Sequence, residues 1–475
     1  MPRRQLLLFP LPFQGHINPM FELAALLHSR SGCSGGGGGG GDGVDFSITI
    51  LHTTTHPITS PMHPSYRYVS LAPVDDELSN SNCDRELPPI VEDVVLHIFH
   101  LNARFEASFR DRVAAMLEDA EEEPVACVIA DAHWFAVHAA ARRLGVPSVA
   151  LRTGSAASFC SFMAYPLLMQ KGYIPVKESE LNEAVEEVPP MRVRDLPRVD
   201  QSDPVAVAEL LAKVVAGVRN SSGLILNAAE LMESAEVDKI RRELAHIQVF
   251  AIGPLHKFTP LAAQPNQLPP DRTCLAWLDA QPAASVLYVS FGSVASLPEK
   301  HFVETAFGLA LSGRAFLWVV RPGSVRGPRG AAVETKLPEG FEETTRGRGR
   351  VVEWAPQQEV LRHRAVGAFW THCGWNSTLE AISEGVPLIC APQFGDQMGN
   401  ARYATRVWGI AAEVEGELWE RGRIAAVIKA VMEGREGEEM RERARELKQK
   451  LSASVSRGGS SHAGAERLVE YLKSL

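Results

Sequence analysis

A histidine, a glycine and an asparagine are packed into one short turn at residues 371–377, between an apolar strand-like run and a helix-like run. At such a junction the unpaired N–H groups and the positive dipole end of the helix face the space beyond the carboxyl end of the strand, where a ligand cleft would lie. Gly374 would let a ligand approach the backbone, and His372, Asn376 and Ser377 would add polar contacts. The pattern favours binding of an anionic group, most simply a phosphate, although a plain helix N-cap uses the same residue types.

Residues on either side of this turn could bind the rest of a nucleotide. Trp354 opens the segment "WAPQQ", where an indole can stack on a base and Gln357 can pair with the edge of that base. Glu380 lies one helical turn beyond Asn376, and its carboxylate could accept both hydroxyls of a ribose. The turn and its neighbours together predict a nucleotide site.

Two further segments would extend that site toward a sugar. Ser293 follows another strand in "SFGS" and could add a phosphate contact. Asp396 and Gln397 follow a later strand in "PQFGDQ" and could hold sugar hydroxyls. Groups for base, ribose, diphosphate and sugar therefore occur in one part of the chain, which predicts a sugar-nucleotide ligand.

A second chemical pair lies near the other end of the chain. His16 stands in "QGHINP" after the first strand, and Asp131 ends a different strand. If both strands belong to one parallel sheet, both side chains lie at the same edge, where the carboxylate could orient the imidazole as a general base. An ordinary structural hydrogen bond is the alternative for a single histidine in such a turn, and His133 is a rival either for the partnership with Asp131 or for the role of base.

The elements that must position these residues alternate between strand and helix. A helix is expected at residues 18–30, with Asn18 as N-cap and Pro19 at the first helical position. Buried apolar strands alternating with helices imply parallel sheets, whose ligands sit at the carboxyl ends of the strands. The expected strands are 6–13, 45–53, 125–130, 147–153, 222–228 and 249–254 in a first series, and 285–291, 315–321, 350–355, 366–372 and 386–392 in a second.

The chain of 475 residues is too long for one core, so two domains are expected. We assign residues 1–254 to an N-terminal domain, the proline-rich 255–271 to a linker and 272–459 to a C-terminal domain. The final segment, 460–475, has the pattern of an amphipathic helix. Seven consecutive glycines at 35–41 predict a flexible surface loop.

Composition narrows the class of protein. The net charge of −9 argues against nucleic acid as a partner. The seven cysteines are scattered without CxxC pairs, which indicates reduced thiols and a cytoplasmic location. The apolar run after Arg3-Arg4 contains Pro10 and Pro12, which favours a buried strand over a signal peptide, and no run is long enough to span a bilayer.

The stretch from Trp354 to Gln397, "WAPQQEVLRHRAVGAFWTHCGWNSTLEAISEGVPLICAPQFGDQ", resembles the signature box of plant family-1 UDP-dependent glycosyltransferases. The resemblance extends to "FPLPFQGHINPM", "PPMRVRDLP" and "SVLYVSFGS", and the N-terminal half is most similar to the branch with benzoxazinoid, diterpenoid and cytokinin glucosyltransferases. The glycine run departs from the family pattern.

The resemblance implies the GT-B fold: two doubly wound, Rossmann-like domains whose parallel sheets face an interdomain cleft. It implies an N-terminal acceptor domain onto which the terminal helix packs back, and a C-terminal UDP-sugar domain. It also assigns residues to the UDP-sugar: Trp354, Ala355 and Gln357 at the uracil end, Glu380 at the ribose, Ser293, His372, Gly374, Asn376 and Ser377 around the phosphates, and Trp375, Asp396, Gln397 and Thr153 at the sugar.

We therefore expect an enzyme that transfers glucose from UDP-glucose, with inversion, to a hydroxyl or amine of a small hydrophobic acceptor such as a phenolic, terpenoid or hormone. His16 would be the base and Asp131 its orienting partner. No metal and no cofactor is expected, UDP-glucose being a co-substrate, and the protein is expected to be a monomer. The alternatives are a catalytically silent UDP-sugar-binding scaffold and another GT-B-type sugar-nucleotide enzyme.

Overall fold

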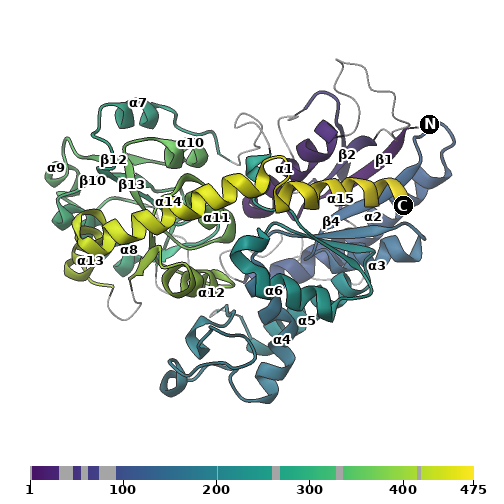
Figure 1. Ribbon diagram of the computed structural model, residues 1–475, viewed down its shortest axis with the longest axis horizontal. Helices are drawn as coiled ribbons and strands as arrows, with labels where there is room; N and C mark the ends of the chain where they lie inside the picture. The colour runs from purple at the N-terminus through teal and green to yellow at the C-terminus, as the bar shows by residue number, and fades with distance from the viewer. Residues whose placement is uncertain are drawn as a thin grey trace, which may run out of the picture.

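The computed structural model describes residues 3–30, 46–54, 63–73, 93–199, 202–258, 268–327, 335–414 and 419–475. These residues form two lobes, each built around one parallel sheet (Figure 1). The predicted glycine loop at 35–41 lies outside the described residues, as do residues 259–267 of the predicted linker.

The N-terminal lobe contains a seven-stranded sheet in the order β3-β2-β1-β4-β5-β6-β7, in which every paired neighbour is parallel. Its strands are β1 (Arg4–Phe9), β2 (Phe46–Thr53), β3 (Arg67–Leu71), β4 (Val125–Asp131), β5 (Ser148–Arg152), β6 (Gly223–Leu226) and β7 (Gln248–Ala251). Its helices are α1 (Gln14–Arg30), α2 (Val94–Glu118), α3 (Phe135–Arg143), α4 (Ala156–Gln170), α5 (Pro204–Arg219) and α6 (Glu230–Glu243).

The C-terminal lobe contains a six-stranded parallel sheet in the order β12-β10-β8-β13-β14-β15. Its strands are β8 (Val286–Ser290), β10 (Ala315–Val319), β12 (Gly349–Val352), β13 (Val366–Thr371), β14 (Leu388–Cys390) and β15 (Ala411–Glu413), beside a short pair, β9 (Leu297–Pro298) and β11 (Val325–Arg326). The helices of this lobe are α7 (Thr273–Asp279), α8 (Glu299–Ser312), α9 (Phe341–Thr344), α10 (Gln357–Arg362), α11 (Trp375–Glu384), α12 (Gln397–Arg402), α13 (Arg421–Glu433) and α14 (Arg435–Val455). The last helix, α15 (Ser460–Ser474), packs on the N-terminal lobe.

Both sheets are doubly wound, as predicted. In the first sheet the chain adds strands in one direction from β1 and in the other direction from β4, so the switch point lies between these two neighbours. In the second sheet the switch point lies between β8 and β13. Ligands of such sheets bind outside the carboxyl ends of the strands at the switch point, so the topology specifies one candidate site edge in each lobe.

The start of α1 differs from the prediction. The helix begins at Gln14, so Asn18 is not its N-cap and Pro19 lies inside it. The reason is that the backbone N–H groups of His16 and Ile17 both reach the carbonyl of Phe13, at 2.8 and 2.9 Å, and begin the helical hydrogen-bond pattern early. β1 likewise ends at Phe9 instead of residue 13.

The last helix returns to the N-terminal lobe. In Figure 1, α14 runs along the C-terminal lobe and α15 continues over the N-terminal sheet. Leu468 and Leu472 are fully buried in the same apolar cluster as residues of β1 and β2, and the Tyr471 hydroxyl donates to the Ser222 carbonyl at 2.5 Å. Throughout the described ranges no helix is both long and apolar enough to cross a membrane, and Cys127, Cys160, Cys274, Cys373 and Cys390 are buried and unbridged.

Candidate active site

A cavity of about 580 Å³ lies between the two switch points and is lined by both lobes. His16 and Thr153 line it from the N-terminal lobe, and Asp131 is buried behind His16. All the site residues predicted in the C-terminal lobe also line the cavity: Ser293, Trp354, Ala355, Gln357, His372, Gly374, Trp375, Asn376, Ser377, Glu380, Asp396 and Gln397. The structure thus brings the two predicted clusters, which are far apart in the sequence, onto one cavity.

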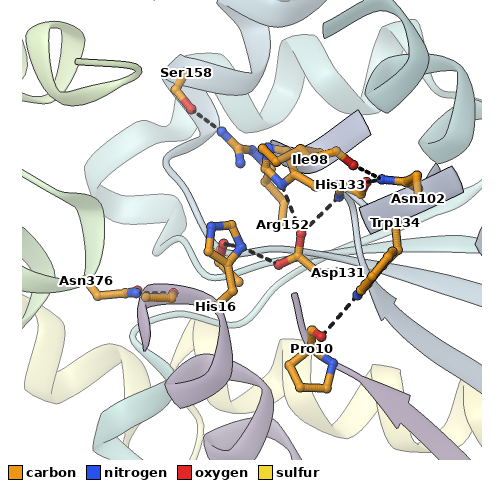
Figure 2. Close-up of polar contacts among 12 residues, drawn as sticks. Pro10, His16, Ile98, Asn102, Asp131, His133, Trp134, Arg152, Ser158 and Asn376 are labelled. Atoms are coloured by element: carbon orange, nitrogen blue, oxygen red, sulfur yellow. Dashed lines mark hydrogen bonds and ion pairs between the residues drawn. The ribbon is translucent and has the colours of Figure 1, made fainter. Parts of the chain in front are cut away.

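His16 is held in the first turn of α1 by the carboxylate that ends β4. Its Nδ1 lies 2.7 Å from Oδ2 of Asp131 (Figure 2). Thr153 Oγ1 lies 3.1 Å from the same nitrogen. The His16 side chain is 21% exposed while that of Asp131 is fully buried. One ring nitrogen is therefore fixed by the protein, and the other, Nε2, is left for the cavity, which is the geometry of an oriented general base.

Asp131 contacts two histidines at once. Its second oxygen, Oδ1, lies 2.9 Å from Nδ1 of His133 and accepts the His133 backbone N–H at 2.9 Å. Burial alone would raise the pKa of Asp131, but the two neighbouring imidazoles outweigh it and hold the pKa below the usual range. The sequence left His133 as an alternative partner for this carboxylate. In the structure both histidines contact Asp131, each at a different oxygen.

At the predicted nucleotide end of the cavity, polar side chains form a network of hydrogen bonds with one another. Gln357 Nε2 donates to Ser377 Oγ at 3.0 Å and to Glu380 Oε2 at 2.7 Å, and Gln357 Oε1 accepts from the Tyr288 hydroxyl at 3.2 Å. The other oxygen of Glu380 accepts from Gln358 at 3.1 Å. Burial raises the pKa of Glu380 even though both glutamine amides oppose it.

Two members of this network were not predicted. Tyr288 lies inside β8, a strand whose residues are all buried, so in the sequence it looks like an ordinary core residue. Gln358 stands next to Gln357 in the doubled "QQ" of the box, and that repetition was the available signal.

His372 is clamped between two glycines. A Cβ at Gly292 or at Gly374 would lie 2.5 Å from Nε2 of His372, and Gly292 also has a positive φ of 78°. Burial, followed by the charge of Arg321, lowers the pKa of His372 to about 4. The ring is therefore neutral near pH 7, and it would meet a phosphate as an N–H donor instead of a cation.

Two residues that were predicted to contact the ligand, Trp375 and Asn376, make side-chain hydrogen bonds between the lobes. Asn376 donates from Nδ2 to the Gly15 carbonyl at 2.6 Å, and its Oδ1 accepts from Asn227 at 3.2 Å. The indole N–H of Trp375 donates to the Asn227 carbonyl at 2.7 Å. The Gly15 carbonyl is available because Pro19, four residues on, has no N–H. Asn227, which the sequence analysis missed, thus helps join the two lobes.

The predicted sugar end contains one amide with a fixed orientation. Gln397 Oε1 accepts the backbone N–H groups of Gln393 and Phe394 at 2.8 and 3.2 Å, which leaves its NH₂ group for a ligand. Asp396 lies beside it, near the buried guanidinium of Arg152, since a Cβ at Gly154 would contact both. Thr153, predicted to touch the sugar, lines the cavity and contacts His16.

Across the described residues, the grouping of side chains whose ligand atoms lie close enough for a metal ion is His16, Asp131 and His133, within 4.8 Å of one another. The hydrogen bonds among these three residues account for their closeness without an ion.

A doubly wound pair of lobes with a histidine–aspartate pair on one edge and a polar side-chain network on the other is the arrangement expected of a sugar-nucleotide transferase. Residues 106–444 match the family described as UDP-glucoronosyl and UDP-glucosyl transferase, and the chain belongs to this family of UDP-glycosyltransferases. It is therefore an enzyme of the glycosyltransferase class, with the GT-B fold.

Characterised relatives cover nearly the whole chain. It is 45% identical to DIMBOA UDP-glucosyltransferase BX8 of Zea mays, over 99% of this chain and 98% of that protein. It is 40% identical to UDP-glycosyltransferase 76B1 of Arabidopsis thaliana, over 98% and 97%.

Solved structures agree with the fold. A UDP-glucosyltransferase from Polygonum tinctorium capable of glucosylating indoxyl, solved with 3,4-dichloroaniline, superposes with a TM-score of 0.79 at 30% identity, over 100% of this chain and 99% of that one. Phytolacca americana UGT2 complexed with UDP-2fluoro-glucose and pterostilbene gives a TM-score of 0.75 at 28% identity, over 99% of each chain.

Proposed function

We propose that this enzyme transfers glucose from UDP-glucose to a hydroxyl or amine of a small hydrophobic acceptor, with His16 as general base and Asp131 as its orienting partner. The observation that carries the proposal is the 2.7 Å contact between His16 Nδ1 and the buried Asp131 carboxylate at one wall of the cavity. The hydrogen-bonded network around Gln357 and Glu380 forms the opposite wall. Relatives named for glucosyl transfer from UDP-sugars support the donor.

The reaction follows from these positions. The acceptor oxygen attacks the anomeric carbon of glucose while the bond from that carbon to the diphosphate oxygen breaks, and its electron pair leaves with UDP. The acceptor proton passes to Nε2 of His16, and the resulting imidazolium is stabilised by Asp131. A single displacement inverts the anomeric carbon, so α-linked UDP-glucose gives a β-glucoside.

Donor binding uses the network already described. Trp354 would stack on uracil, while Gln357 and Glu380 would exchange their mutual hydrogen bonds for uracil and ribose. Ser293, Ser377 and neutral His372 would meet the phosphates. Because the side chains of Trp375 and Asn376 are engaged between the lobes, their contacts to the donor would come from backbone N–H groups at the start of α11.

An apolar wall favours a hydrophobic acceptor. Phe13, Val94, Ile98, Phe162 and Leu211 line the cavity on the His16 side. We propose that no metal or organic cofactor takes part, since the base and the donor network together supply the groups that the displacement needs.

The test is to incubate purified protein with UDP-glucose and a panel of phenols, terpenoid alcohols and amines, before and after dialysis against EDTA. Mass spectrometry should detect a hexosyl product whose anomeric proton coupling by NMR is that of a β-glucoside, and EDTA should leave the rate unchanged. UDP binding without any product would instead favour the silent scaffold, and an α-product would exclude the single displacement.

A further inference from the structure

His133 is a second imidazole fixed to the carboxylate that holds His16. Its backbone N–H and its Nδ1 both meet Oδ1 of Asp131 at 2.9 Å, and its carbonyl accepts from Asn102 Nδ2 at 2.9 Å (Figure 2). Asn102 is itself held, because its Oδ1 accepts the Ala136 N–H at 3.0 Å. Contacts on its backbone and ring therefore fix His133, which is more rigid than a side chain that only lines a cavity.

The contact with Asp131 also fixes the tautomer of His133. An ionised carboxylate can only accept, so Nδ1 of His133 must carry the hydrogen. Burial lowers the pKa of His133 and outweighs Asp131, which by itself would raise that pKa. The ring is therefore neutral near pH 7. Nε2 therefore presents a lone pair, and no described residue donates a hydrogen bond to it.

The two imidazoles lie side by side at the apolar end of the cavity. Their ring centroids are 5.3 Å apart at an interplanar angle of 82°, and both residues line the cavity. Phe162 meets His133 edge-on and Phe13 meets His16 in the same manner. The two rings thus lie beside aromatic side chains, with the buried guanidinium of Arg152 also near His133. An acceptor such as Nε2 of His133 that a covering ligand leaves without a donor is costly there.

The two rings differ in their connection to the donor lobe. The turn that carries His16 is bonded to the C-terminal lobe through the Gly15 carbonyl and Asn376 at 2.6 Å. The contacts of His133 among the described residues all lie within the N-terminal lobe. The geometry therefore places the base at His16 and leaves His133 to contact another part of the acceptor.

We propose that His133 Nε2 accepts a hydrogen bond from a second donor group on the acceptor, adjacent to the hydroxyl that His16 deprotonates. The preferred acceptors are then small aromatic molecules with two neighbouring donors, such as vicinal hydroxyls. His133 takes no proton, and one glycosidic bond forms at the hydroxyl facing His16. This inference rests on the proposed function and names the acceptor class of the same site.

The test compares naphthalene-2,3-diol with 2-naphthol, which lacks the second hydroxyl, and with 3-methoxy-2-naphthol, which blocks it. The wild-type enzyme should show kcat/KM at least about tenfold higher for the diol, a ratio in the range of one buried hydrogen bond. His133→Phe should reduce that ratio to about twofold or less and leave the affinity for UDP nearly unchanged. Rates for 2-naphthol should fall as well, because the variant loses the contact with Asp131, but by a smaller factor than rates for the diol. His133→Gln, whose amide oxygen can accept, should retain part of the preference.

Three results would overturn the inference. The wild-type enzyme could use the diol and 2-naphthol equally well. His133→Phe could lower all rates by the same factor, which would make His133 a positioning residue for Asp131 alone. If the phenylalanine variant does not fold, His133→Gln provides the same test. Equally reduced rates for all acceptors in that variant, with an unchanged ratio, would lead to the same conclusion. Failure of the wild-type enzyme to glucosylate any acceptor would overturn the proposed function itself, a result that a missing preference does not mimic.

Discussion

The edges of the two sheets face one cavity but are arranged in opposite ways. At the edge of the C-terminal sheet, Gln357, Ser377 and Glu380 hydrogen-bond to one another. At the edge of the N-terminal sheet, His16 and His133 each use one nitrogen to contact Asp131 and keep the other free for the cavity. A network that can exchange its internal hydrogen bonds for bonds to a ligand suits recognition of one fixed sugar donor. Two rigid imidazoles, each with one nitrogen not bonded to Asp131, suit proton transfer and selection of the acceptor molecule.

The largest expected effect tests the N-terminal edge. His16→Ala should lower kcat by about 10²–10⁴-fold, the usual contribution of a general base, while calorimetry should find UDP affinity nearly unchanged. If transfer and UDP affinity were lost together, His16 would hold the fold or the nucleotide, and the division of labour between the edges would fail.

An exchange of carboxylate for amide at each edge should give opposite kinetic results. Asp131→Asn should lower kcat about 10²-fold or more with little change in UDP affinity, because the imidazolium loses its counter-charge. Glu380→Gln should weaken UDP binding about tenfold while kcat at saturating UDP-glucose stays within about threefold, because it removes an acceptor that is part of the donor network. Steady-state kinetics and UDP titrations on both variants would refute the comparison if the two profiles were alike.

A smaller effect is expected from the glycine clamp on His372. Gly292→Ala would put a Cβ 2.5 Å from the imidazole at a φ of 78°, so the ring must move and UDP affinity should fall about tenfold. Gly313→Ala is the matched control, since Gly313 has a similar φ of 71° but open space around its Cβ position. The control should lose about 1 kcal/mol of stability and bind UDP normally; equal UDP binding by both variants would mean that the clamp has no functional role.

The smallest expected effect concerns the buried carboxyl group of Glu233, which lies beside the start of α4. Glu233 accepts the Ala157 N–H at the start of α4, and burial raises its pKa from 4.5 to about 8. The folded protein therefore binds more protons than the unfolded chain between these values, so stability should fall as pH rises from about 5 to 8 and level off above. Glu233 should contribute roughly 1–2 °C of Tm loss per pH unit.

Glu233→Gln provides the check, because it keeps the accepting oxygen and removes the titration. The Tm difference between variant and wild type, measured from pH 5 to 9, should shift in favour of the variant as pH rises. A constant difference would show that Glu233 is ionised in the folded state.

Much of this architecture could be predicted from local patterns, and the exceptions share a cause. Alternating apolar runs indicated the parallel sheets, and polar residues after strands indicated most of the cavity wall. The start of α1 was wrong because Phe13, which accepts the first helical N–H groups, carries no N-cap signal, whereas Asn18-Pro19 looks like one. No local pattern could show that Trp375 and Asn376 would contact Asn227, since those bonds exist only once the lobes meet.

The return of α15 to the first lobe has a consequence for biosynthesis. Leu468 and Leu472 complete an apolar cluster whose other members, such as Leu6 and Ile50, are translated first. The N-terminal sheet must leave the ribosome with part of one face uncovered, and that part stays exposed until α15 has emerged. Nascent chains of this enzyme should therefore depend on chaperones until α15 has emerged, and stalled chains that lack α15 should be captured by chaperones more often than chains that contain it.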